Sequence, residues 1–132
     1  MNQEELNQKF GAFEQQIRQI QEQLGAIEQA ILDMSQIKFG LDEIKGKTGE
    51  DIMAPIGRGV YVKAKLLSEE LTVDVGGKNF VGKSIEDTKK LINEQIEKLK
   101  GIKVELEKEL DKINGEITAV MKEHEKEIKV NC

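Results

Sequence analysis

Apolar side chains in the first third of the chain recur at alternating spacings of four and three residues. The repeat begins at Leu6 and continues to Leu41, with Lys38 in one of its positions. A repeat of 3.5 residues keeps one stripe of a helix turned toward a partner helix, while the other positions, here mostly Gln and Glu, face water. We therefore predict a coiled-coil helix that ends near Gly46, with Gly46 or Gly49 in the left-handed conformation of a helix cap. This stripe, the first seam, consists of Leu6, Phe10, Phe13, Ile17, Ile20, Leu24, Ile27, Ile31, Met34 and Leu41.

A second helix is predicted to begin at Ser84, because Ser84 and Asp87 form the S-x-x-D pattern of a capping box. Its apolar residues again follow a period of seven, with Lys103 and His124 in seam positions. Two helices of similar length predict an antiparallel coiled-coil hairpin. We interpret Lys38 and Lys103 as residues that set its register or reach out to water, in preference to a ligand-binding role. The second seam consists of Ile85, Ile92, Ile96, Leu99, Leu106, Leu110, Ile113, Ile117 and Val120.

The connector between the helices has a different pattern, with short segments that are rich in β-branched residues and separated by glycines. Apolar residues at Val60 and Val62 alternate with Tyr61 and Lys63, which is typical of a strand with one buried face. Pro55 is expected at an edge or at the start of a strand, because it cannot donate a hydrogen bond to a neighbour. We predict four strands in two hairpins, drawn from residues 52–56, 59–66, 71–75 and 79–81.

The chain is thus predicted to be mainly α with a small β module. One domain over residues 1–132 would comprise a coiled-coil helix in 1–46, a β-hairpin module in 47–83 and a second coiled-coil helix in 84–132. A β module of this size cannot bury a stable core, and its outer strands expose unpaired edges, so we expect it to assemble with other chains. The predicted assembly residues are Ile52, Pro55, Ile56, Val60, Val62, Leu71, Val73, Val75, Phe80 and Val81.

The composition agrees with extended helices and argues against several functional classes. Charged residues make up 34% and aromatic residues 4% of the chain, and the net charge of −5 comes from interspersed charges of both signs. This argues against binding to a nucleic-acid backbone. No apolar run approaches the ~18 residues of a membrane span, and the first residues do not resemble a signal peptide. We expect a soluble, cytoplasmic protein without a membrane partner, and interpret Cys132, the only cysteine, as an exposed thiol.

The segment from Gly77 to Ser84 matches the G-x-x-x-x-G-K-[ST] pattern of a phosphate-binding loop. That loop follows a strand of a helix-covered parallel sheet, whereas the next helix here is a coiled-coil arm. We prefer a glycine-rich turn followed by a helix cap, and keep nucleotide binding around Lys83 as a minor alternative. His124 has no second histidine or internal cysteine with which to bind zinc. We predict no enzyme, no catalytic residue, no metal and no cofactor.

Three stretches of the connector form a distinctive pattern: Asp51–Ala64, with its apolar-Pro-apolar sequence and V-Y-V stretch, Val73–Gly77, and Lys83-Ser84 before the second helix. In these residues the chain resembles the α class of prefoldin subunits. The resemblance implies an ATP-independent co-chaperone in which two α and four β subunits join their β hairpins into a double barrel. It also implies that the coiled-coil tips hold non-native polypeptides and pass them to a group II chaperonin.

The predicted client-binding site is the tip of the coiled coil, where both helices have their free ends. The last turns of a coiled coil fray and expose apolar residues. The same residues also continue the seams, so we expect them to alternate between closed and frayed states. A rival interpretation is a structural protein whose β module builds a filament or scaffold and whose helices are spacers. The predicted tip residues are Leu6, Phe10, Phe13, Val120, Met121, Ile128 and Val130.

Overall fold

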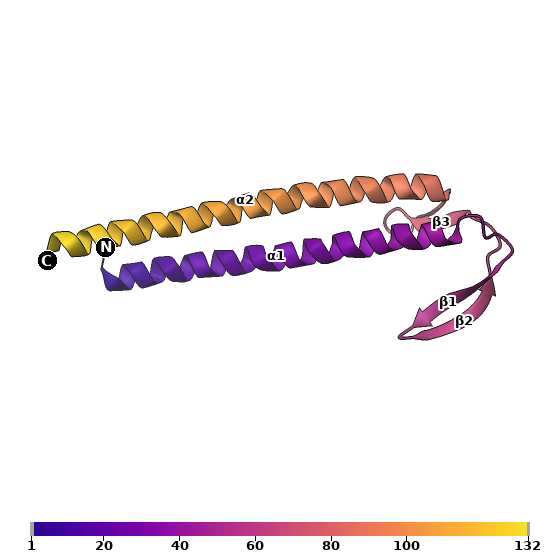
Figure 1. The fold of residues 1–132 in the computed structure, drawn as a ribbon, viewed down its shortest axis with the longest axis horizontal. Helices are drawn as coiled ribbons and strands as arrows, with labels where there is room; N and C mark the ends of the chain where they lie inside the picture. Colours follow the sequence, from indigo (N-terminus) through magenta and orange to yellow (C-terminus); the bar gives the residue numbers. More distant parts are fainter. Residues whose placement is uncertain (1, 132) are drawn as a thin grey trace. The chain divides into compact units, whose positions relative to one another are not determined.

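The computed structural model describes residues 2–131 of the chain, and the side chains of residues 2–128. Val130 and Cys132, both considered above, are therefore outside the described side chains. The predicted fold class, mainly α with a small β module, is confirmed (Figure 1). In chain order, the described elements are α1 (Gln3–Ile44), β1 (Asp51–Gly57), β2 (Val60–Lys65), β3 (Leu71–Asp74), β4 (Phe80–Lys83) and α2 (Ile85–Asn131).

Local side chains and one glycine determine where the helices begin and end. Asn2 caps α1, because its Oδ1 accepts a hydrogen bond from the backbone N–H of Glu5 at 2.8 Å. After the last residue of α1, Gly46 has a φ of 78°, the left-handed conformation of a helix cap. Ser84 caps α2, since its Oγ accepts a hydrogen bond from the N–H of Asp87 at 3.0 Å. The predicted end of the first helix and start of the second are confirmed.

The chain packs as two compact units. The helical unit comprises the chain up to Ile31 and from Lys98 onward, and the hairpin unit comprises Leu32–Glu97. Helix is the only regular structure described in the helical unit, whereas the hairpin unit contains the second part of α1, all four strands and the first part of α2. Both units contain buried seam residues of the helices, and the hairpin unit contains the strands in addition.

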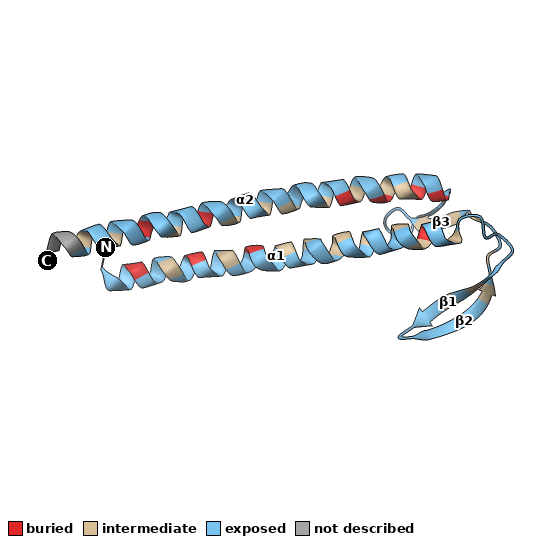
Figure 2. Cartoon of the chain, viewed as in Figure 1, coloured by how far each residue is buried: buried red, intermediate tan, exposed pale blue. Residues whose placement is uncertain are grey.

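In the helical unit, α1 and α2 lie side by side and run in opposite directions (Figure 1). Buried residues recur at intervals along both helices (Figure 2), and every seam residue predicted for this unit is buried or half-buried. The predicted coiled-coil seam is confirmed here. Its core consists of Leu6, Phe13, Ile20, Ile113 and Val120, packed by Phe10, Ile17, Leu24, Leu106, Leu110 and Ile117.

Lys103 occupies a seam position but does not end in the apolar seam. Its Nζ lies 3.5 Å from Oε1 of Glu28 on the facing helix, and its side chain is 36% exposed. A lysine stem can cover apolar surface while its charged end reaches water and an acidic partner. This geometry agrees with the interpretation of Lys103 as a residue that extends out of a narrow seam.

The first hairpin, in the hairpin unit, pairs β1 with β2 in a two-stranded antiparallel sheet. Pro55 lies within β1 opposite Tyr61, and both strands of such a sheet are edges, so the expected edge position is confirmed. The prediction of one buried face is wrong for the isolated chain, because Val60 is 56% exposed and Val62 is 48% exposed. A single layer of two strands gives these side chains no second layer to pack against.

The second hairpin pairs β3 with β4, and Val73 lies opposite Val81. Its turn is closed by Asp74, whose Oδ1 accepts a hydrogen bond from the N–H of Gly76 at 2.9 Å. Gly76 and Gly77 have φ values of 127° and 60°, conformations that favour glycine. The prediction of four strands in two hairpins is confirmed.

Candidate functional site

The glycine-rich motif before α2 forms a strand and a helix cap. Gly82 and Lys83 belong to β4 and pair with Thr72 and Leu71 of β3. The hydroxyl of Ser84 is engaged with the backbone at the start of α2. A phosphate-binding loop would instead wrap its backbone N–H groups around the anion. The extended conformation of Phe80–Lys83 within this motif therefore disfavours the alternative of nucleotide binding around Lys83.

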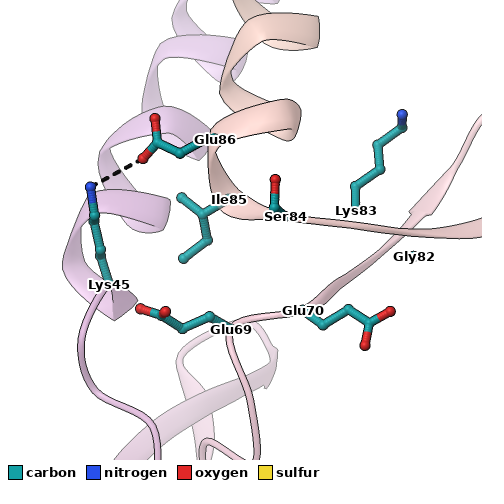
Figure 3. A pocket seen from close by; sticks show the side chains of 8 residues that line it. All are labelled: Lys45, Glu69, Glu70, Gly82, Lys83, Ser84, Ile85 and Glu86. Carbon is teal, nitrogen blue, oxygen red and sulfur yellow. Dashed lines mark hydrogen bonds and ion pairs between the residues drawn. The ribbon is translucent and has the colours of Figure 1, made fainter.

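A pocket of about 460 Å³ lies beside this motif (Figure 3). The Nζ of Lys45, just after α1, lies 3.1 Å from Oε1 of Glu86 in the first turn of α2. The carboxylate of Glu69 accepts a hydrogen bond from the N–H of Gly46. Glu70 also lines the pocket, so carboxylates outnumber ammonium groups and an anion is disfavoured there. These contacts tie the ends of both helices to the linker between the hairpins, which is a structural role.

The predicted tip residues divide into a packed group and an exposed group. Leu6, Phe13 and Val120 are buried together in the core of the helical unit, with Phe10 packed against them. The rings of Phe10 and Phe13 are tilted by 52°, with their centroids 6.5 Å apart. Val130 lies beyond the described side chains. The exposed tip residues are Met121 at 51% and Ile128 at 50%.

His124 lies among the packed tip residues, at the seam position predicted from the repeat. Its ring is half-buried, and Nδ1 is buried without a hydrogen-bond partner among the groups that the structure describes. The small cavity beside it, about 10 Å³, is lined by Leu6 of α1 and by Val120, Glu123 and Glu127 of α2. The seam pattern located this histidine. It carried no information about whether the ring nitrogens would find partners.

The predicted assembly residues form an exposed apolar surface on the two hairpins. Ile56 is 72% exposed and Phe80 is 62% exposed, and Val75 and Val81 are also exposed. Of the ten predicted assembly residues, only Ile52, Leu71 and Val73 are half-buried. Exposed apolar surfaces of this kind are typical of interaction sites. The prediction missed three further exposed apolar residues: Met53, Tyr61 and Leu67.

The half-buried residues of β3 line a groove within the hairpin unit. Leu71 and Val73 face a groove of about 640 Å³ whose other walls include Ile37 of α1 and Leu91 of α2. Neither Ile37 nor Leu91 belongs to a seam, so the seven-residue repeat could not identify them. The sequence did contain one sign of this groove. Ile37 and Ile44 are seven residues apart, so they repeat on one side of the helix, next to the seam.

One ion pair joins the two helices inside the hairpin unit. Nζ of Lys89 contacts Oδ1 of Asp42, and the side chain of Lys89 is only 21% exposed. The hydrogen bond from Lys89 lowers the pKa of the Asp42 carboxyl below its usual value of 3.8. The same bond raises the pKa of the Lys89 ammonium above its usual value of 10.5. The pair therefore stays charged across the neutral range.

Two other kinds of site were sought within the described part of the chain. No group of three or more His, Cys, Asp or Glu side chains there is placed to hold a metal ion. None of the helices described has the length and apolar character needed to cross a membrane.

Comparisons with known proteins point to one family. A family model described as Prefoldin subunit matches residues 13–129. The chain is 30% identical over 129 residues to Prefoldin subunit alpha 1 of Methanocaldococcus jannaschii, a match that covers 95% of this chain and 89% of that protein. It is 28% identical over 89 residues to Prefoldin subunit alpha of Methanosphaera stadtmanae, covering 67% of this chain. That second match spans 64% of the relative, slightly less than two thirds of its length.

A solved structure supports the fold. The cryo-EM structure of filamentous PFD from Methanocaldococcus jannaschii aligns with a TM-score of 0.79 and 23% sequence identity. The alignment covers 89% of this chain and 98% of that chain. At this level of identity the likeness shows that the two chains share a fold.

Proposed function

The chain belongs to the prefoldin family, as a subunit of the archaeal α type, and from this premise we propose that it is an ATP-independent co-chaperone subunit. Its coiled-coil tip captures unfolded polypeptides and keeps them from aggregating. The assembled complex delivers them to a group II chaperonin in the cytoplasm. Prefoldins are a chaperone family, so the role assigned to this chain is binding.

The observation that carries this proposal is the placement of apolar residues at the free ends of the helices. Leu6, Phe13 and Val120 are each less than one tenth exposed, while Met121 and Ile128 beside them are half exposed. The last turns of a helix pair have packed neighbours on one side only, so they open at a lower free energy than the middle. Opening presents the packed residues to a client next to an apolar surface that is already exposed.

A single tip supplies only part of the affinity that a holding chaperone needs. Burying one of these side chains contributes about 2 kcal/mol, whereas micromolar binding needs about 8 kcal/mol after the cost of association. Several tips that engage one client raise the effective concentration and supply the remainder. We therefore propose that the chain acts within an assembly.

The hairpin surface is the element through which that assembly forms. Each hairpin has two edge strands, and residues such as Ile56, Val60 and Phe80 are more than half exposed in the isolated chain. Adding strands from other subunits would pair the edges and cover these side chains in the same step. We propose that two copies of this chain join four prefoldin β subunits in this way.

The decisive experiment compares the full chain with a variant trimmed to residues 13–120, each mixed with a candidate β subunit. Native mass measurement reports assembly, and light scattering of a denatured client, without nucleotide, reports holding. We expect both chains to assemble equally, because the hairpin surface is intact in both, and only the full chain to suppress aggregation. Undiminished suppression by the trimmed chain would rule out the tip as the client site.

A second candidate function is a structural filament. The relative in the solved structure is filamentous, and the free strand edges on both hairpins of this chain could also propagate an open-ended assembly. Mass measurement on the chain alone and with a β subunit separates the two. A closed hexamer supports the chaperone complex, whereas a broad, concentration-dependent size distribution supports the filament.

A further inference from the structure

We infer that His124 sets how readily the tip of the coiled coil opens. The inference rests on the proposed function, because it concerns the same tip, and it names the residue that controls the exposure of the client-binding side chains. A histidine at a seam position lowers the stability of the helix pair locally, because the other positions of the stripe are mostly apolar.

In the closed tip, the ring of His124 is half-buried beside a small cavity. Nδ1 of His124 is buried, and within the described chain it has no hydrogen-bond partner. The adjoining cavity of about 10 Å³ is at the lower limit of the space that one water molecule occupies. The side chains of Leu6 and Val120 that line this cavity are 5% and 8% exposed. The closed tip therefore buries a polar nitrogen that has no hydrogen-bond partner among the described groups, which is unfavourable.

Separation of the helices at the tip would change the surroundings of His124 on the α1 side. Leu6 is the only α1 residue that lines the cavity, while Glu123 and Glu127 are on α2 with His124. Glu123 and Glu127 are on the same helix as the ring, so their position beside it does not depend on α1. A ligand or group biases an equilibrium only through interactions that differ between its two states. The differing interaction here is the burial of Nδ1 beneath Leu6, and its loss favours the open tip.

The other polar seam residue of the helical unit provides a contrast. Lys103 also interrupts the apolar stripe, but its Nζ reaches Glu28 on α1 and its side chain is 36% exposed. That cross-helix pair is made in the closed state and lost on separation. The two polar seam residues therefore act in opposite directions, and only His124 favours opening.

The test is amide hydrogen exchange on the full-length chain, comparing three variants with the parent protein. His124→Leu replaces the ring with an apolar side chain suited to a seam. His124→Asn keeps a polar atom close to the position of Nδ1. Lys103→Leu is the matched control, since it makes the same kind of replacement away from the tip. The amides of residues 6–13 and 120–128 report the tip, and those near Ile20 and Ile113 are the internal reference.

We expect His124→Leu to slow exchange of the tip amides about tenfold relative to the reference amides, which corresponds to removing one unpaired buried polar group. The Asn variant should exchange at least as fast as the parent, and Lys103→Leu should leave the tip amides unchanged. Tip exchange that is not slowed by His124→Leu, or that is slowed equally by His124→Asn, overturns the inference.

A second readout separates this inference from the proposed function. If His124→Leu slows tip exchange and weakens suppression of client aggregation, both stand. If tip exchange slows but suppression is unchanged, His124 controls opening as inferred, and the proposal that clients bind at the opened tip fails.

Discussion

The seam of the helical unit and the apolar surface of the hairpins contain the same kinds of side chain, but only the seam finds its partner within the chain. Ile20 is 7% exposed because α2 covers it, whereas Val60 is 56% exposed because its hairpin is a single layer. Removing apolar side chains from water is favourable. The difference indicates which interactions the chain makes alone and which it leaves for other subunits.

This contrast also separates two roles. The seam residues of the helical unit are buried or half-buried against the facing helix, and under the proposed function they become available to a client only where the ends of the helices open. Seven of the ten assembly residues on the hairpins are exposed in the isolated chain. Under the proposed function these side chains are covered on assembly, while the tip binds clients reversibly.

The largest effect is expected on the affinity of assembly, when charged side chains are introduced into the exposed apolar surface of the hairpins. The double variant Val60→Lys/Val62→Lys should weaken assembly with β subunits roughly a thousandfold, because burying each valine contributes about 2 kcal/mol. The helical content of the isolated chain should not change, since both side chains are about half exposed in it. Titration by native mass measurement checks this result. Lys63→Gln, on the other face of β2, is the control, and equal losses in both variants would refute the assignment of the face.

The next largest effect is expected in the seam. Ile20→Ala should lower the free energy of unfolding by about 2 kcal/mol, the value for removing a well-packed aliphatic side chain. Ile102→Ala, at a position that is 49% exposed, should change it little, because alanine is also the better helix former. Urea denaturation followed by circular dichroism measures both. Similar losses at the two positions would show that the seam is not the source of stability.

The sequence predicted the seam down to individual positions, because a period of seven directly encodes which side chains face the partner helix. Even Lys38 and Lys103, which break the apolar stripe, are half-buried as the repeat requires. The cap at Ser84 was predictable for a similar reason, since it depends on a residue only three positions away.

The features that the sequence could not reveal depend on contacts between distant segments. The groove containing Ile37 exists because β3 folds back beside the helices, and no local pattern specifies that return. The alternation in β2 predicted a buried face, yet the chain alone provides nothing to bury it. The environment of Nδ1 of His124, which has no hydrogen-bond partner in the described part of the chain, likewise depends on the packing of Leu6 from the other end of the sequence. At the candidate site, the sequence therefore predicted which residues lie there, but not which groups from distant segments they contact.

A smaller effect on the free energy of unfolding is expected when alanine replaces either of two glycines that have different backbone conformations. Neither Gly25, within α1, nor Gly46, after it, has any atom within 4 Å of an added Cβ, but Gly46 has a φ of +78°. Gly25→Ala should therefore stabilise the chain by about 0.5–1 kcal/mol. Gly46→Ala should destabilise it by about 1 kcal/mol, because alanine is strained in the left-handed region. Urea midpoints test both, and shifts of the same sign would contradict this account.

The smallest effect is expected from the ion pair between Asp42 and Lys89, and it should depend on pH. Because its hydrogen bond to Lys89 lowers the pKa of Asp42, the stabilisation is present above pH 3.8 and is lost as the pH falls below that value. Because the pKa of Lys89 is raised, the stabilisation is present below pH 10.5 and is lost as the pH rises further. The difference in melting temperature between the parent and Asp42→Asn should be constant from about pH 5 to 9 and shrink outside that range. Glu43→Gln, at the exposed neighbouring position, is the control. A difference that persists unchanged below pH 3 would show that the carboxylate charge does not contribute, and that the hairpin unit gains nothing from this pair beyond packing.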